Sequence, residues 1–264
     1  MTVKARVQSM VRALHVAASR DVLPDRIGIY FHSLEPQDWE EFERVVRFFR
    51  EEQGYQLTDA SGFLARLPAR RLVISFDDNY HTWYESRRLF ARLDVRVSFY
   101  VNTLPFLCEL GSNELVDYYK RLKHSGWGVP LGRGAIRELL ADGHTIGAHT
   151  HSHFVLATIP EAQAIWEITH SKLLLEEILE VPIIHFAYPY GMRRHFSESL
   201  RSICLRVGFK TIANGIPGLQ FASQRHDRIQ RSPWLLHRSF EHNLSNLKID
   251  GRLFERITGR SAVV

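Results

Sequence analysis

The chain alternates short apolar runs with longer segments of helical periodicity, and this alternation constrains the fold more than any other feature. Candidate strands occupy residues 27–31, 72–76, 97–101, 145–148, 183–187, 209–213 and 234–240. Candidate helices occupy residues 38–52, 82–93, 135–141, 160–180 and 197–207. Strands that alternate with helices predict a parallel sheet with helices outside it. Seven such strands predict a closed or nearly closed α/β barrel.

The chain shows no internal repeat, low-complexity tract or linker, which favours a single domain over residues 25–264. An excursion over residues 104–132, rich in Gly, Tyr and Trp, interrupts the barrel rhythm and is expected to lie over one face. Residues 1–24 form a basic amphipathic segment with apolar residues at helical spacing. We favour a helix packed on the body of the protein, and peripheral contact with a membrane is the alternative.

Composition removes several classes of protein. No stretch approaches the roughly 18 uncharged apolar residues that a membrane span requires. Basic residues interrupt the first 24 positions, so no secretory signal is visible, and we expect a cytoplasmic protein, either free or at the membrane face. Two isolated cysteines form neither a disulfide framework nor a metal-ligand spacing. The net charge of +5 comes without the interleaved aromatic and basic residues of nucleic-acid binders.

Polar side chains follow most of the predicted strands, at the point where each strand ends. They are His32, Asp77, Asp78, Asn102, residues 149–153 and residues 188–191, with His237 inside the last run. In α/β barrels and parallel sheets, chemistry gathers at the carboxyl edge of the strands. We therefore expect these side chains to meet in one site.

The stretch SFDDNY ends a buried strand on Asp77 and Asp78, two like charges whose burial is costly. Either the pair lies in a polar turn, or a cation is held there. His149 and His153 stand four residues apart, and with one carboxylate they would form a set suited to zinc, with cobalt or nickel as alternatives. The second carboxylate could then take a proton from water. Because adjacent residues of a strand point in opposite directions, the two roles require the chain to turn there.

The motifs SFDD, HTHSH and FAYPYG resemble, in their order, the first three motifs of the NodB-type polysaccharide deacetylases, carbohydrate esterase family 4. The resemblance spans most of the chain. It implies a distorted (β/α)7 barrel and metal-dependent removal of an acetyl group, usually N-acetyl, from a sugar. It also assigns roles by position. Asp77 resembles the general base, Asp78, His149 and His153 resemble the metal ligands, and Tyr190 resembles the donor of a backbone N–H to the oxyanion.

The motifs depart from the family pattern in two places. Ala187 stands where many members carry an arginine that braces the base, and Arg238 is one candidate to replace it. The general acid has two candidates. The run 235–237 (LLH) matches the family's late Leu-x-His motif and offers His237. IGIYFHSL, however, resembles the opening strand of the biofilm exopolysaccharide deacetylases, in which this motif is permuted to the N-terminus. We favour His32, because it follows directly on a strand.

The substrate side of the site is less specified. Pro189, Trp83, His237 and Arg238 are the residues expected to contact substrate, although large aromatics such as Trp83 are more often packing residues. We expect a deacetylase that acts on a sugar of a cell-envelope polysaccharide, a glycolipid or their precursor. The alternatives are the same site acting on a non-sugar amide or cyclic imide, and a non-catalytic sugar-binding protein. The intact set of carboxylates and histidines speaks against the last alternative.

Overall fold

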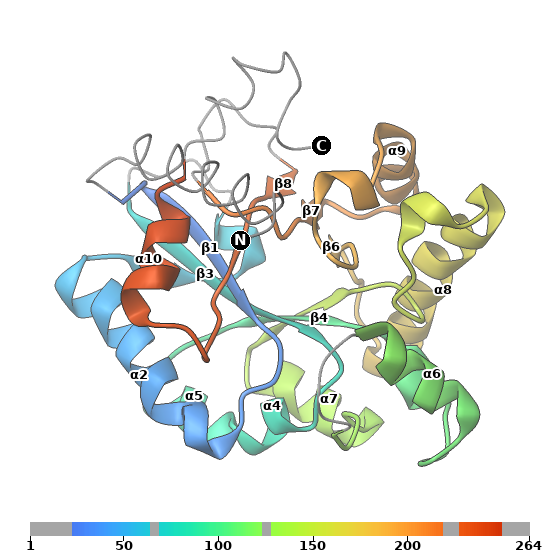
Figure 1. The fold of residues 1–264 in the computed structure, drawn as a ribbon. Coiled ribbons are helices and arrows are strands. Elements are labelled where there is room, and N and C mark those ends of the chain that lie inside the picture. The colour runs from blue at the N-terminus through green and yellow to red at the C-terminus, as the bar shows by residue number, and fades with distance from the viewer. Residues whose placement is uncertain (1–22, 64–68, 123–127, 219–226, 250–264) are drawn as a thin grey trace, which may run out of the picture.

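The computed structural model describes residues 23–63, 69–122, 128–218 and 227–249. Within these residues, nine strands form one curled parallel sheet with helices around its outside (Figure 1). The strands are β1 (Arg26–Phe31), β2 (Gln56–Thr58), β3 (Arg71–Asp78), β4 (Ser98–Val101), β5 (Thr145–Ala148), β6 (His185–Ala187), β7 (Thr211–Ala213), β8 (Arg228–Ile229) and β9 (Ser232–Pro233). This is the predicted distorted barrel of a single α/β domain. The predicted N-terminal segment 1–24 lies almost wholly outside the described residues.

The strand order is β8-β7-β6-β5-β4-β3-β1-β9, and β2 pairs with β3 beside this path. β1 runs along one edge of β3, from the pair Arg26–Arg71 to the pair Phe31–Phe76. On the other edge β2 pairs with the first residues of β3, and β4 pairs with the stretch that ends at Asp78. β3 is therefore covered on both edges and both faces, and all eight of its residues are buried.

Helices and short helical turns fill the connections. The α-helices are α2 (Trp39–Arg47), α3 (Ala60–Phe63), α4 (Thr82–Glu85), α5 (Arg87–Arg92), α6 (Asn113–Leu122), α7 (Arg133–Ala141), α8 (Glu161–Leu179), α9 (Glu198–Val207) and α10 (Phe240–Leu247). The remaining turns are η1 (Pro36–Asp38), η2 (Phe48–Glu52), η3 (Leu104–Phe106), η4 (Leu156–Thr158) and η5 (Arg193–His195). None of the helices in the described ranges is both long enough and apolar enough to span a bilayer.

The strands divide their side chains between two environments, as the period of two requires. In β3, Leu72, Ile74 and Phe76 join the large core between sheet and helices. Val73 belongs to a second, smaller cluster, and the next side chains of this alternate set are Ser75 and Asp77. Towards the carboxyl end of β3, this set thus changes from the apolar Val73 to polar side chains, where the predicted site lies.

The last predicted strand, 234–240, is wrong. The last strand of the described residues is β9, and a turn then leads to α10. Ser239 caps this helix, and its side chain accepts a hydrogen bond from the backbone N–H of His242. The run is apolar although it is not a strand, because Trp234 packs edge-to-face against Phe49 and Phe240. The excursion at 104–132 contains η3 and α6 in its described part.

Candidate active site

Side chains from the carboxyl ends of several strands meet in one pocket. Its lining residues are Tyr30, His32, Asp77, Asp78, Leu122, His149, His153, Tyr190, Gly191 and Gly215. Tyr30, Asp77 and Asp78 belong to β1 and β3, whereas His32, His149 and Tyr190 follow β1, β5 and β6. Leu122 comes from α6, so the excursion takes part in the site. The structure brings together six of the side chains that the sequence predicted.

A backbone turn at Asp78 separates the two adjacent carboxylates. Asp78 has a φ of 88°, a left-handed conformation that is rare for a residue other than glycine. Consequently both side chains reach the pocket, although neighbours on a regular strand point to opposite faces. The turn that the two roles required is present.

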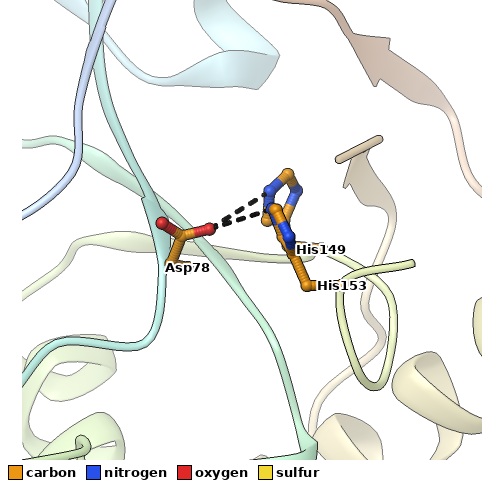
Figure 2. A group of neighbouring side chains, drawn as sticks. All are labelled: Asp78, His149 and His153. Carbon is orange, nitrogen blue, oxygen red and sulfur yellow. Dashed lines mark ion pairs between the residues drawn. The ribbon is translucent and has the colours of Figure 1, made fainter. Parts of the chain in front are cut away.

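Asp78, His149 and His153 form a buried cluster whose ligand atoms all lie within 4.8 Å of one another. Figure 2 shows the Asp78 carboxylate facing the two imidazoles. Its Oδ1 lies 3.6 Å from His149 Nε2 and 3.2 Å from His153 Nε2. Two ligands held about 2.0–2.1 Å from a tetrahedral zinc ion are roughly 3.3 Å apart. The cluster therefore fits a small divalent cation.

The hydrogen bonding of this cluster also fits a metal. Asp78 Oδ1 is buried and accepts no hydrogen bond within the described part of the chain. Burial, followed by the charge of Asp77, raises the pKa of Asp78 well above its ordinary value, and a cation bound beside this carboxylate would favour its ionised form. His149 Nδ1 lies 2.8 Å from the carbonyl oxygen of Ala187. Because a carbonyl only accepts, Nδ1 carries the proton, and Nε2 offers its lone pair to the site.

Asp77 is held by an arginine that the sequence analysis did not identify. Arg231 donates from Nη1 to Asp77 Oδ1 at 2.6 Å and from Nη2 to Oδ2 at 2.8 Å. It also donates to Ser75 Oγ at 2.9 Å and to the Asn214 carbonyl oxygen at 3.0 Å. Its guanidinium lies between the rings of Tyr30 and Tyr100 inside the barrel. Arg231 thus occupies the role for which Arg238 was a candidate.

The signal for Arg231 was present in the first strand. A Cβ added to Gly28 would clash with the carbonyl oxygen of Gln230 and would lie 3.0 Å from Arg231 Cγ. A glycine inside a strand marks such a close approach of another backbone. From the sequence alone, Gly28 indicates that another backbone segment lies close to this strand, but it does not identify Arg231 as the residue there.

The ion pair determines the charge of Asp77. Burial by itself would raise the pKa of Asp77, but the Arg231 guanidinium, with smaller contributions from His149 and His32, lowers it below its ordinary value. The carboxylate is therefore ionised at neutral pH. Its two oxygens have about four acceptor positions, of which Arg231 uses two, so Asp77 can still accept a proton from water.

The two candidate acids are placed very differently. His32 lines the pocket directly after β1, and its carbonyl oxygen accepts a 2.7 Å hydrogen bond from Trp83 Nε1. His237 is exposed in the turn before α10 and is not a lining residue. The geometry therefore agrees with His32 as the acid, which stays a prediction.

The residues expected on the substrate side are corrected by their positions. Trp83 is fully buried and stacks on Phe99 at 5.0 Å, so it is a core residue. Pro189 is buried and does not line the pocket, and Arg238 is exposed beside His237. Tyr190 does reach the pocket, with a left-handed φ of 63° and its ring 4.7 Å from that of His153.

The comparisons with known proteins agree with this geometry. The family model described as polysaccharide deacetylase matches residues 65–212. The deacetylase PplD of Streptococcus pyogenes, solved in complex with acetate, shares 18% identity at a TM-score of 0.66, covering 85% of this chain and 98% of its own. IcaB from Ammonifex degensii shares 17% identity at 0.63, covering 83% and 94%.

The deacetylase domain of BpsB from Bordetella bronchiseptica shares 16% identity at a TM-score of 0.62, covering 81% of this chain and 98% of its own. At these identities the structural likeness supports the fold alone. A search of the curated proteins gives no significant match. The family match covers more than half of the chain and includes all three motifs, which confirms the resemblance drawn from them, and the chain belongs to the polysaccharide deacetylase family.

Proposed function

We propose that the protein is a zinc-dependent deacetylase that removes the N-acetyl group of an acetamido sugar in a cell-envelope polysaccharide, a glycolipid or their precursor. One observation carries the proposal. The buried Asp78–His149–His153 cluster shares a pocket with Asp77, a carboxylate that Arg231 keeps ionised. Family membership supports the reaction class. Cobalt and nickel are the alternatives to zinc, because the same nitrogen and oxygen ligands suit them.

Asp78, His149 and His153 would hold the ion, which, when bound, supplies a Lewis acid for the acetyl carbonyl and makes nearby water more acidic. The chain's own groups carry the protons. Asp77 takes one from the attacking water, and Arg231 keeps the Asp77 carboxylate oriented throughout. His32 gives one to the departing amine, so the amide C–N bond breaks to acetate and a free amino sugar. The backbone N–H of Tyr190 is the proposed donor to the oxyanion.

The test separates the two aspartates, because the proposal gives them different tasks. Acetate release from N-acetylated oligosaccharides is measured with the zinc-loaded protein, and bound metal is measured by elemental analysis. Asp77→Asn should keep the metal and lose turnover, because an amide is no base. Asp78→Asn should lose both, since it removes a ligand. Full turnover in Asp77→Asn, or full metal content in Asp78→Asn, would contradict the assignment.

A further inference from the structure

A buried carboxylate outside all the motifs contacts the loop that carries the two histidines. Glu167 lies on α8 with 1% of its surface exposed. Its Oε2 accepts the backbone N–H of Ser152 at 2.8 Å, and its Oε1 accepts the Ser152 hydroxyl in a short hydrogen bond. Burying a carboxylate costs several kcal/mol unless hydrogen bonds compensate for the lost water. Here both hydrogen bonds come from one serine of the 149–153 loop.

Arg121 contacts the same serine at its backbone carbonyl. Its Nε donates to the Ser152 carbonyl oxygen at 2.7 Å, while its guanidinium stacks on the Phe154 ring at 4.6 Å. The backbone carbonyl of Arg121 accepts the Tyr190 hydroxyl at 2.7 Å. The N–H, the hydroxyl and the carbonyl of Ser152 are therefore all engaged, and the same contacts reach the proposed oxyanion donor.

The loop needs such restraint because its backbone is strained. Thr150 and His153, on either side of Ser152, have left-handed φ values of 67° and 63°. A residue other than glycine adopts this conformation at a cost and persists in it only where its surroundings fix it. A hydrogen bond from His153 N–H to Thr150 Oγ1 at 3.2 Å fixes the loop internally. The contacts at Ser152 fix it to α8 and α6.

We propose that Glu167 and Arg121 are positioning residues that clamp Ser152 and so set the geometry of the His149–His153 pair. The inference rests on the proposed function, because it assumes that this pair binds a metal. It assigns a function to part of the 104–132 excursion, since α6 brings Arg121 to the 149–153 loop. It also explains why a carboxylate is buried in the second turn of α8, at the end of that helix nearest to the site.

The test replaces Glu167 by its neutral isostere. Glu167→Gln keeps the shape but removes the charge. Its amide oxygen can still accept the Ser152 N–H, and its NH₂ can only use the Ser152 hydroxyl as an acceptor, so two charge-assisted hydrogen bonds are replaced by weaker neutral ones. Glu177→Gln on the exposed side of the same helix is the matched control. Zinc affinity is measured by competition with a chromophoric chelator, and the visible absorption of the cobalt-loaded protein reports ligand geometry. Groups that orient metal ligands typically change affinity by about 10–100-fold.

We expect Glu167→Gln to weaken zinc binding about tenfold and to alter the cobalt spectrum, with no change in Glu177→Gln. Arg121→Met tests the other side of the clamp and should act in the same direction. Ser152→Ala removes only the hydroxyl and serves if Glu167→Gln does not fold. A lower urea midpoint with unchanged zinc affinity and cobalt spectrum would show a merely structural role and overturn the inference. A wild-type protein that binds neither metal would refute the proposed function itself, and this inference with it.

Discussion

The Asp77–Arg231 pair can be tested by a double-mutant cycle on the stability of the metal-free protein. Both oxygens of Asp77 are engaged by Arg231, at 2.6 and 2.8 Å, and Arg231 is 1% exposed. Removing one partner of a buried pair typically costs about 3–5 kcal/mol, mostly because the other charge is left buried and unpaired. Removing both partners takes that penalty away.

The remaining contacts of Arg231 decide how the cost is divided. Arg231→Met also leaves the Ser75 hydroxyl and the Asn214 carbonyl without this donor, so we expect it to lose ~4 kcal/mol. Asp77→Asn keeps an acceptor for the guanidinium but loses the charge, and we expect a loss of ~3 kcal/mol. The double variant should lose no more than Arg231→Met alone, ~4 kcal/mol, because it lacks the Ser75 and Asn214 contacts but leaves no unpaired charge; this corresponds to a coupling energy of about 3 kcal/mol.

Urea unfolding followed by circular dichroism, in the presence of a chelator, gives the four free energies of unfolding. Arg231→Lys retains a cation without the bidentate geometry and forms a second cycle if the methionine variant is too unstable to measure. Single losses that add within about 0.5 kcal/mol in the double variant would refute the reasoning, because they would show that the two side chains do not stabilise each other.

Three further predictions concern histidines. His149→Ala and His153→Ala should each lose most of the zinc affinity in a chelator competition, and retained affinity in either would remove it from the ligand set. His32→Ala should lower kcat about 10²- to 10⁴-fold with metal content unchanged, whereas replacing the exposed His237 by Ala should leave kcat unchanged. An activated ester, whose leaving group needs no proton, should partly rescue His32→Ala. A large loss and ester rescue in His237→Ala, with His32→Ala like wild type, would assign the acid to His237. Burial lowers the pKa of His185 to about 4, so the unfolded chain binds the extra proton between pH 6.5 and 4 and stability falls as pH falls through this window. Between pH 7 and 5, the free energy of unfolding of His185→Gln, measured with urea, should fall by about 2 kcal/mol less than that of wild type. An equal fall in the two proteins would contradict a buried neutral His185.

The fold was predictable wherever local periodicity and burial agree. The strand at Thr145–Ala148 was predicted with its observed bounds, and the helix predicted at 160–180 is observed at Glu161–Leu179. The errors lie where tertiary contacts, and not the local sequence pattern, decide whether a segment forms a strand. β2, with three residues, is too short to show alternation, and it forms because the start of β3 offers an open edge. The run after Pro233 is apolar because Trp234 packs under α10, and periodicity does not distinguish that from a strand.

The site was predictable where a motif carries its own spacing. The carboxylates of SFDD and the two histidines of HTHSH meet as the strand-end rule requires. Arg231, Glu167 and Arg121 were not predicted, because each reaches the site through tertiary contacts from a distant part of the chain. Trp83 shows the opposite error. Its aromatic ring was a candidate to contact substrate, but the ring is buried against Phe99.

The asymmetry of the two aspartates explains how adjacent carboxylates can be buried together. Asp77 has its counter-charge within the fold, because the buried Arg231 guanidinium pairs with it. Asp78 faces two imidazoles, and burial lowers the pKa of His149, so that neutral ring offers a lone pair and no charge. Under the proposed function the counter-charge of Asp78 comes from a bound cation, and the left-handed turn at Asp78 is what allows the two sides to differ. The fold thus separates a carboxylate whose counter-charge belongs to the chain from one that, under the proposed function, gains its counter-charge from a bound metal.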